Sequence, residues 1–211
     1  MTERVQVHEP FVDPAQQHAA DMLGMYIFLA SEIMLFGGLF AVLFVCRLLH
    51  PQEIAAASKE LHLWIGGINT AILLTSSLAV AIAVQLARQG SRRAVAISLA
   101  AAAALGAGFL ILKAVEYRLE YSDGLLPGFS TASKFANPAT HLFMNIYLIA
   151  TVLHAVHLSI GILLLAGLVW KLLRRSLQVP KRASVIAVSG LYWHLVDVIW
   201  IFLYPALYLI R

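Results

Sequence analysis

Ionisable residues recur inside the long apolar runs of this 211-residue chain, and their spacing is the first guide to its chemistry. In the last run, His194 and Asp197 are three residues apart, which places them on one face of an α-helix. An ionisable group in a membrane-spanning helix costs roughly 2.5–3.5 kcal/mol on insertion scales, so it faces protein, water or a partner. We favour a neutral histidine hydrogen-bonded to a carboxylate at a helix–helix contact. A proton or metal site is the alternative.

Ser31 and Glu32 lie deep in the first apolar run, which starts at Leu23. At about 1.5 Å of rise per residue, Glu32 is roughly 13 Å from the start of that run and close to mid-membrane. Desolvation there favours the protonated, neutral form of a carboxyl group. Two interpretations stay open: Glu32 is a proton-linked or lipid-contacting carboxyl, or it is a protonated side chain hydrogen-bonded to a neighbouring helix.

The fourth run contains His154 and His157, again three residues apart. Two imidazoles at this spacing can share a metal ion or a haem, but only with further ligands from other helices. No cysteine pair, carboxylate-rich helix pair or haem-attachment motif accompanies them in the sequence. We therefore predict interhelical or lipid-headgroup hydrogen bonds for these histidines, and no metal, haem or copper bound by this chain alone.

Charged residues close the third run, where Lys113, Glu116 and Tyr117 precede Arg118. Long charged side chains at the end of a span can extend to the water outside the bilayer. We expect Lys113 and Glu116 to do so.

Membrane-spanning helices must position these residues. With 61% hydrophobic and 12% charged residues and a mean hydropathy of +0.82, the chain is too apolar for a soluble domain. The net charge of +4 does not indicate nucleic-acid binding, because Lys and Arg form short clusters between apolar runs, as they do in membrane loops. The single cysteine, Cys46, excludes an internal disulfide.

Five apolar runs are each long enough to cross the hydrocarbon layer of roughly 30 Å, which takes about 20 helical residues. They cover residues 23–46, 63–87, 94–117, 141–170 and 184–209. No stretch alternates apolar and polar residues as a membrane β-strand does, and each helix satisfies its own backbone in lipid. The sequence therefore predicts an all-α, polytopic membrane protein. Residues 1–22 form an N-terminal cytoplasmic segment, and residues 23–211 form a five-transmembrane-helix bundle.

Lysine and arginine predict the orientation of the bundle, because cytoplasmic loops are enriched in both. An N-terminus in the cytoplasm and a C-terminus outside place the larger group of basic residues on the cytoplasmic side. That group is Arg4, Arg88, Arg92, Arg93, Lys171, Arg174, Arg175, Lys181 and Arg182. The smaller outer group is Arg47, Lys59, Lys113, Arg118, Lys134 and Arg211.

Polar and aromatic motifs follow one another in a specific order along these runs. They are residues 24–40 with Ala30-Ser31-Glu32, then Asn69-Thr70, residues 113–117 leading to Ser122-Asp123-Gly124, residues 154–157, and residues 192–200 with Phe202-Leu203-Tyr204. This order resembles that of subunit III of the haem-copper respiratory oxidases, the cytochrome c and quinol oxidases. The resemblance extends from Leu23 to Tyr208, and the last motif is its most specific part.

The resemblance implies a non-redox accessory subunit of a proton-pumping terminal oxidase of aerobic respiration, in the five-span form of a bacterial inner membrane. Such a subunit has no catalytic centre of its own. It packs on catalytic subunit I, beside subunit II and small subunits, and it supports proton uptake, phospholipid binding and the stability of the complex. Haem and copper are implied in subunit I, with copper also in subunit II if the electron donor is cytochrome c.

The resemblance also implies roles for single residues. The family's carbodiimide-reactive glutamate lies in a Ser-Glu pair that matches Ser31-Glu32. The family's lipid-cleft and helix-packing side chains match His154, His157, Glu116, His194 and Asp197. Glu32, His154, His157 and Glu116 are thus candidates for proton-linked or lipid contacts, and His194 and Asp197 are candidates for a helix-packing polar pair.

The chain departs from the longer, seven-span members, because it begins at their third span. Their lipid cleft lies between the first two spans and the rest; in some bacterial oxidases an extended subunit I supplies those two spans.

Two other functions stay open: a related accessory subunit of a nitric oxide reductase, and a proton-linked transporter. Against the transporter stand the lack of an inverted repeat and of helices broken by Gly or Pro in matching halves.

Overall fold

The computed structural model describes residues 14–125, 138–180 and 183–209, and every regular element within them is a helix. In chain order these are α1 (Pro14–Leu49), α2 (Pro51–Lys59), α3 (Leu63–Arg88), α4 (Arg92–Ser122), α5 (Pro138–Leu173), α6 (Ala183–Tyr204) and the π-helical turn η1 (Pro205–Leu209). Five helices are long and apolar enough to cross a membrane, which confirms the predicted all-α bundle. At 36 residues, α5 exceeds the length of a bilayer crossing, as its apolar run predicted.

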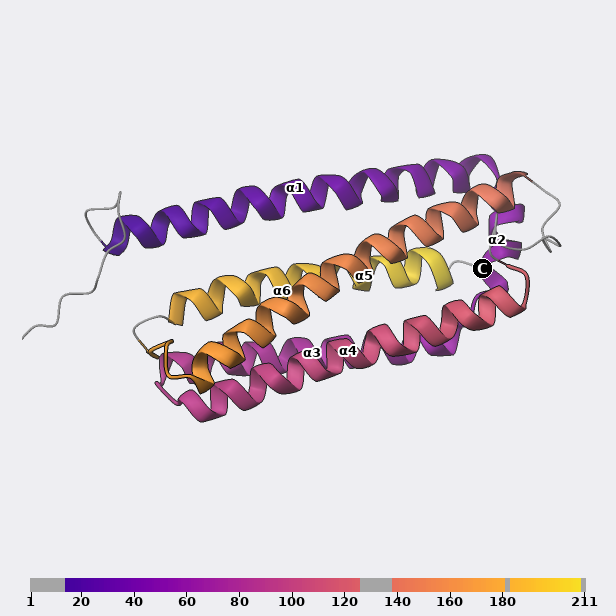
Figure 1. Ribbon diagram of the computed structural model, residues 1–211. Coiled ribbons are helices and arrows are strands. Elements are labelled where there is room, and N and C mark those ends of the chain that lie inside the picture. The colour runs from indigo at the N-terminus through magenta and orange to yellow at the C-terminus, as the bar shows by residue number, and fades with distance from the viewer. Residues whose placement is uncertain (1–13, 126–137, 181–182, 210–211) are drawn as a thin grey trace, which may run out of the picture.

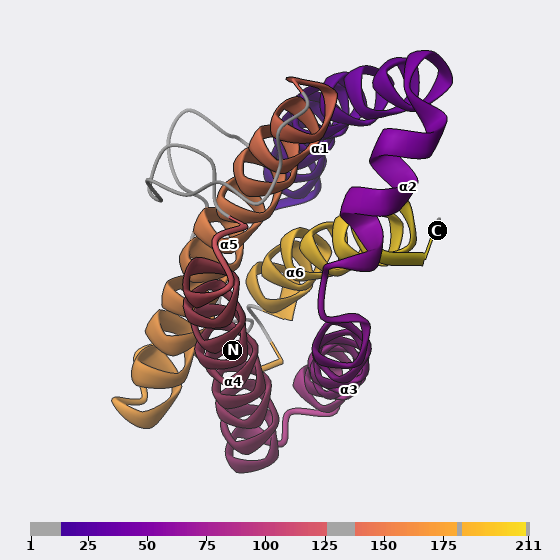
Figure 2. The ribbon, with the colours of Figure 1, turned by 90° about the vertical axis from the view of Figure 1, so that its right-hand side faces the viewer.

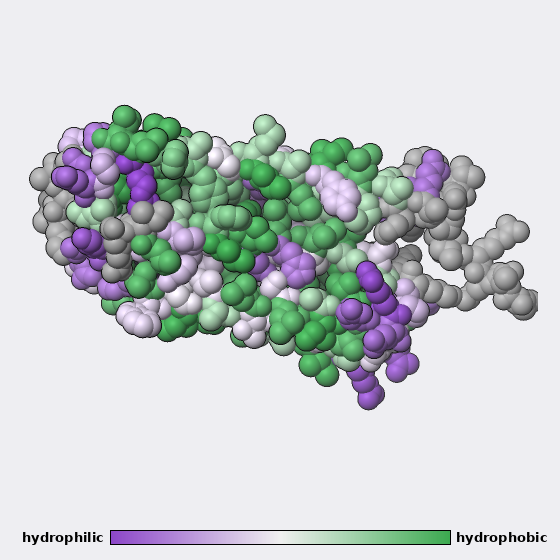
Figure 3. All heavy atoms as spheres, turned by 180° about the vertical axis from the view of Figure 1, so that it is seen from behind, coloured by the Kyte–Doolittle hydropathy of each residue, from purple (hydrophilic) through white to green (hydrophobic). Residues whose placement is uncertain are grey.

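The face of the bundle seen in Figure 3 is mostly apolar over its middle and more hydrophilic towards its two ends. Met34, Ile97 and Leu163 are 78%, 70% and 73% exposed. A water-soluble bundle turns such residues inward, whereas here they cover the outside of the helices. The chain is therefore a multi-pass membrane protein.

Helix α6 lies in the middle of the bundle, with the other long helices around it (Figure 2). The antiparallel helices α3 and α4 lie on one side of α6, and α1 lies on the opposite side, along α5 and α6 (Figure 1). Small side chains let α3 and α4 approach closely. Ser76 of α3 donates a hydrogen bond of 3.0 Å to the carbonyl of Ala102 in α4.

Trp193 of α6 is fully buried where α4, α5 and α6 meet. A β-carbon added at Gly106 would lie 2.8 Å from the Trp193 ring, and one added at Gly161 would lie 3.0 Å from it. These two glycines make room for the indole. Gly108 is another of the small residues of α4, and a β-carbon added there would have no atom within 4 Å.

The short helix α2 was not predicted from the sequence. Pro51 stands at its first turn, where a proline is tolerated, and its inner side buries Ile54, Ala57 and Ser58. The Ser58 hydroxyl donates a hydrogen bond of 2.7 Å to the carbonyl of Leu207 in η1. Helix α2 therefore covers one end of the bundle and holds the C-terminal turn.

Candidate functional site

The structure brings together two residues that the sequence had nominated separately. Glu32 of α1 and His157 of α5 approach within 2.8 Å, measured from Oε2 to Nε2. Their side chains are 12% and 11% exposed. The contact is a close approach rather than an aligned ring N–H hydrogen bond. The edge of Phe36 packs against the imidazole, with ring centroids 5.4 Å apart.

The second ring nitrogen of His157 limits where protons can sit in this pair. Nδ1 lies 2.8 Å from the carbonyl oxygen of Leu153, and a carbonyl only accepts, so Nδ1 carries a hydrogen. In a neutral ring Nε2 is then an acceptor, and Glu32 must bring the proton between them. If Nε2 carries a proton as well, the pair is an ion pair. With Nδ1 protonated, two bare acceptor atoms 2.8 Å apart would repel each other, so a hydrogen on either Glu32 or Nε2 makes this approach favourable.

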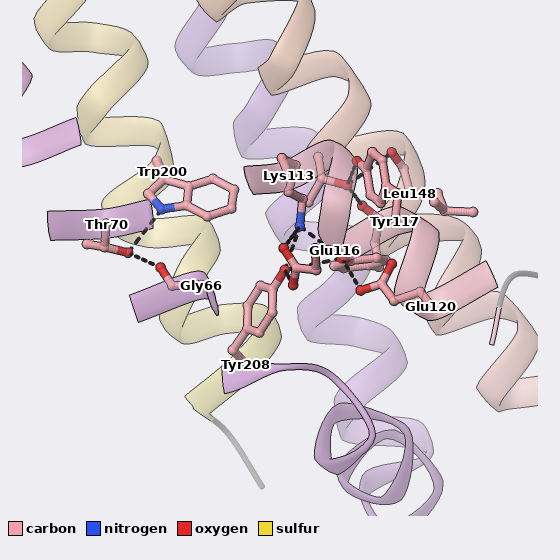
Figure 4. A network of polar contacts seen from close by, with 11 residues as sticks. Gly66, Thr70, Lys113, Glu116, Tyr117, Glu120, Leu148, Trp200 and Tyr208 are labelled. Atoms are coloured by element: carbon pink, nitrogen blue, oxygen red, sulfur yellow. Dashed lines mark hydrogen bonds and ion pairs between the residues drawn. The ribbon is translucent and has the colours of Figure 1, made fainter. Parts of the chain in front are cut away.

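A second polar cluster, which we call the Lys113 network, lies towards the C-terminal end of α4. The ammonium of Lys113 donates to Glu116 Oε2 at 2.9 Å, to the Tyr147 hydroxyl at 2.9 Å and to the Tyr208 hydroxyl at 2.6 Å (Figure 4). The Tyr208 hydroxyl donates in turn to Glu116 Oε1 at 2.8 Å. Helix α4, helix α5 and turn η1 each contribute to this network.

The expectation that Lys113 and Glu116 extend to water is wrong. Lys113 is 2% exposed and Glu116 is 0% exposed. The third span does not end at Tyr117, because α4 continues to Ser122, about 13 Å beyond Lys113. The Lys113 ammonium lies 4.8–5.6 Å from the centroids of four aromatic rings. These rings belong to Tyr117, Tyr147, Trp200 and Tyr208.

Glu120 gives the Lys113 network one more carboxyl group than it has cations. Its Oε1 accepts a hydrogen bond of 2.6 Å from the Tyr147 hydroxyl, and its Oε2 has no hydrogen-bond partner within the described part of the chain. Glu116 is neutralised by Lys113, and a second buried charge without a cation would be strongly destabilising. We therefore assign a proton to Glu120. Sequence spacing held a signal for this cluster, since positions 113, 116 and 120 share one helix face.

His154 does not join His157 in a common site. It is fully buried, and its ring packs between Phe109, at a centroid distance of 5.6 Å, and Trp200, at 5.1 Å. Neither ring nitrogen has a hydrogen-bond partner among the residues that the structure describes. Across the same residues, no three His, Cys, Asp or Glu side chains gather as a metal-ion site.

His194 has a nearer partner than Asp197. Its Nδ1 lies 2.7 Å from the Ser77 hydroxyl of α3 and 4.0 Å from Asp197 Oδ2. The Asp197 side chain is only 4% exposed. Pairing between His194 and Asp197 stays a prediction, and the geometry adds Ser77 as a competing partner across the α3–α6 contact.

The family model for cytochrome c oxidase subunit III matches residues 14–210. The chain belongs to the cytochrome c oxidase subunit III family. Its subunits are accessory chains of haem-copper oxidases, and a chain without a cofactor of its own fits that family.

Curated relatives from several bacteria share this assignment. Over 200 residues the chain is 34% identical to cytochrome c oxidase subunit 3 of Thermostichus vulcanus, covering 94% of this chain and 92% of the relative. Over 194 residues it is 34% identical to quinol oxidase subunit 3 of Bacillus subtilis, covering 90% and 86%. Cytochrome c oxidase subunit 3 of a Synechocystis strain is 29% identical over 191 residues, covering 90% and 75%.

Proposed function

We propose that this chain is a non-redox accessory subunit that packs directly on catalytic subunit I of a proton-pumping terminal oxidase, beside subunit II. The observation that carries the proposal is the match over residues 14–210 to a family of oxidase subunits. Relatives named after two electron donors, cytochrome c and quinol, match to similar extents, and the proposal holds for either donor.

The exposed side of α1 supports contact with another membrane chain. This helix lies at the edge of the bundle, along α5 and α6 only on its inner side (Figure 1). Of the most apolar 18 consecutive residues in its span, 11% are buried, against 44% in the C-terminal span. A helix so little covered by its own chain offers a long apolar surface to subunit I and to lipid.

The Glu32–His157 pair supports the proposed part in proton uptake and lipid contact. It sits between α1 and α5 with about a tenth of each side chain exposed, so it is within reach of a neighbouring chain or lipid. The basic connections from α3 to α4 and from α5 to α6 lie at the same end of the bundle (Figure 1). Their arginines favour a cytoplasmic position for that end in a bacterial inner membrane, with the N-terminus inside.

Affinity purification from native membranes tests the proposal. A tag on this chain, mild detergent and an optical spectrum with metal analysis should recover subunit I with haem and copper. Identification of the co-purified chains by mass spectrometry gives the partners. A chain recovered alone, without haem or copper, contradicts the proposal and favours the transporter. Recovery with a nitric oxide reductase contradicts it in favour of the related reductase subunit.

A further inference from the structure

A groove of about 420 Å³ opens between α1 and α3, with α6 as its floor. We call it the α1–α3 groove. Met22 and Tyr26 line it from α1, Ala81 and Val84 from α3, and Leu191 from α6. Its lining comes from α1, α3 and α6, whereas Glu32 contacts α5 through His157.

The floor of the groove is set by the close contact of α6 with α3. A β-carbon at Gly190 would lie 3.3 Å from Val84 and 3.4 Å from Val80, so the glycine lets the two helices meet. Small side chains at Ala81 and Ala187 then leave the groove open above this contact. At its deep end stands His194, whose Nδ1 is already engaged with Ser77.

From Arg88 inward the lining changes from polar to apolar, with His194 as the one polar side chain at the deep end. Arg88 is the last residue of α3, and Gln85 lies one turn further in. Ala81 lies about 10 Å further into the groove than Arg88, at about 1.5 Å of helix rise per residue. Arg88 forms no ion pair with any residue in the described ranges 14–125, 138–180 and 183–209. Within the described residues, this guanidinium therefore has no carboxylate partner, and it stands at the polar end of the α1–α3 groove.

We propose that the α1–α3 groove binds one anionic phospholipid, with its phosphate at Arg88 and one acyl chain along Ala81, Val84 and Leu191. A guanidinium binds phosphate oxygens through two N–H groups, and the apolar lining below suits a hydrocarbon chain. This apolar depth favours a lipid over free phosphate. The inference deepens the lipid-binding part of the proposed function, and it assigns that part to a groove formed by α1, α3 and α6.

Lipid analysis of the purified oxidase complex tests this site. The complex is partly delipidated and re-equilibrated with deuterated phosphatidylglycerol, or with deuterated phosphatidylethanolamine as the zwitterionic probe, and bound lipid is counted by native mass spectrometry. Arg88→Gln should weaken binding of one phosphatidylglycerol by about tenfold. Ala81→Phe should abolish that binding by filling the groove. Arg93→Gln, at an exposed arginine outside the groove at the same end, should leave it unchanged.

Three results would overturn the inference. The first is equal phosphatidylglycerol binding by wild type, Arg88→Gln and Ala81→Phe. The second is equal binding of both probes at the affected site. The third is loss of another subunit from both variants with bound lipid unchanged, which would make the groove a subunit interface. Each is measured on a haem-containing complex, so failure here leaves the proposed accessory role standing.

Discussion

At the scale of single residues, Glu32 and His157 form a close polar contact between two membrane helices. The Leu153 carbonyl fixes a hydrogen on Nδ1 of His157, so Nε2 is the ring nitrogen that faces Glu32. A glutamine at position 32 can donate its amide N–H to the same Nε2. An alanine leaves that nitrogen unpaired, which costs about 1–3 kcal/mol.

We therefore expect Glu32→Gln to assemble normally and to leave the initial rate of oxygen reduction unchanged. The physical reason is that the amide preserves the contact, while the redox and pumping machinery is proposed to lie in subunit I. Glu32→Ala is the control, and it should lower the thermal midpoint of the purified complex. A several-fold loss of initial turnover in Glu32→Gln, with normal assembly, would show that Glu32 itself conducts protons.

The Lys113 network gives a second prediction at this scale. Lys113→Met removes the cation beside Glu116 and leaves a buried charge unpaired, which should destabilise the chain by about 3–5 kcal/mol. Adding Glu116→Gln should recover much of that loss. The thermal midpoint of the detergent-solubilised complex measures both. A double variant less stable than Lys113→Met alone would show that Glu116 is not held chiefly by Lys113.

The residue types of this network were visible in the sequence, but their surroundings were not. Positions 113, 116 and 120 on one helix face signal a polar cluster. However, Tyr147 and Tyr208 are 34 and 95 residues from Lys113 along the chain, and no local pattern predicts that they reach it. The same holds for Glu32 and His157, whose contact depends on how α1 packs against α5.

At the scale of helices, the α3–α6 contact combines close packing at Gly190 with the polar contact between Ser77 and His194. Ser77→Ala and His194→Phe each remove one partner of the same 2.7 Å contact. Their combined effect on how much of this subunit is retained during purification should therefore differ from the sum of the two single effects. Coupling between His194→Phe and Asp197→Leu should be smaller, since those side chains are 4.0 Å apart. Retention of each single and double variant measures this. Stronger coupling with Asp197 would instead support the pairing predicted from sequence.

Glycines in α4 provide a matched pair for the packing around Trp193. Gly106→Ala places a β-carbon 2.8 Å from a rigid, buried indole, and overpacking of this kind costs about 1–3 kcal/mol. Gly108→Ala, two residues on, enters open space and should be neutral or stabilising. Thermal midpoints of the two complexes make the comparison. Equal midpoints would mean that the indole moves aside without strain.

Apolar run length predicted the five spans well, because a helix in lipid satisfies its own backbone whatever its neighbours do. It predicted the ends of spans less well. Helix α4 passes the charges at Lys113 and Glu116 because tyrosines from other elements solvate them. Helix α2 has nine residues, too few to cross a bilayer, and only its contact with the C-terminal turn explains it.

At the scale of the whole molecule, the chain combines an apolar exterior with two separate polar clusters between its helices. The Lys113 network ties α4, α5 and η1 together, and the Glu32–His157 pair ties α1 to α5. Neither brings together the side chains of a metal site within the described residues.

The most direct test of this account is to compare the purified oxidase with and without this chain. We predict that the depleted complex keeps its haem and copper spectrum and still reduces oxygen. Its proton uptake should be slower, and it should lose activity sooner during continuous turnover. Loss of haem or copper together with the chain, or complete loss of oxygen reduction while every cofactor remains in place, would contradict the assignment of a non-redox accessory subunit.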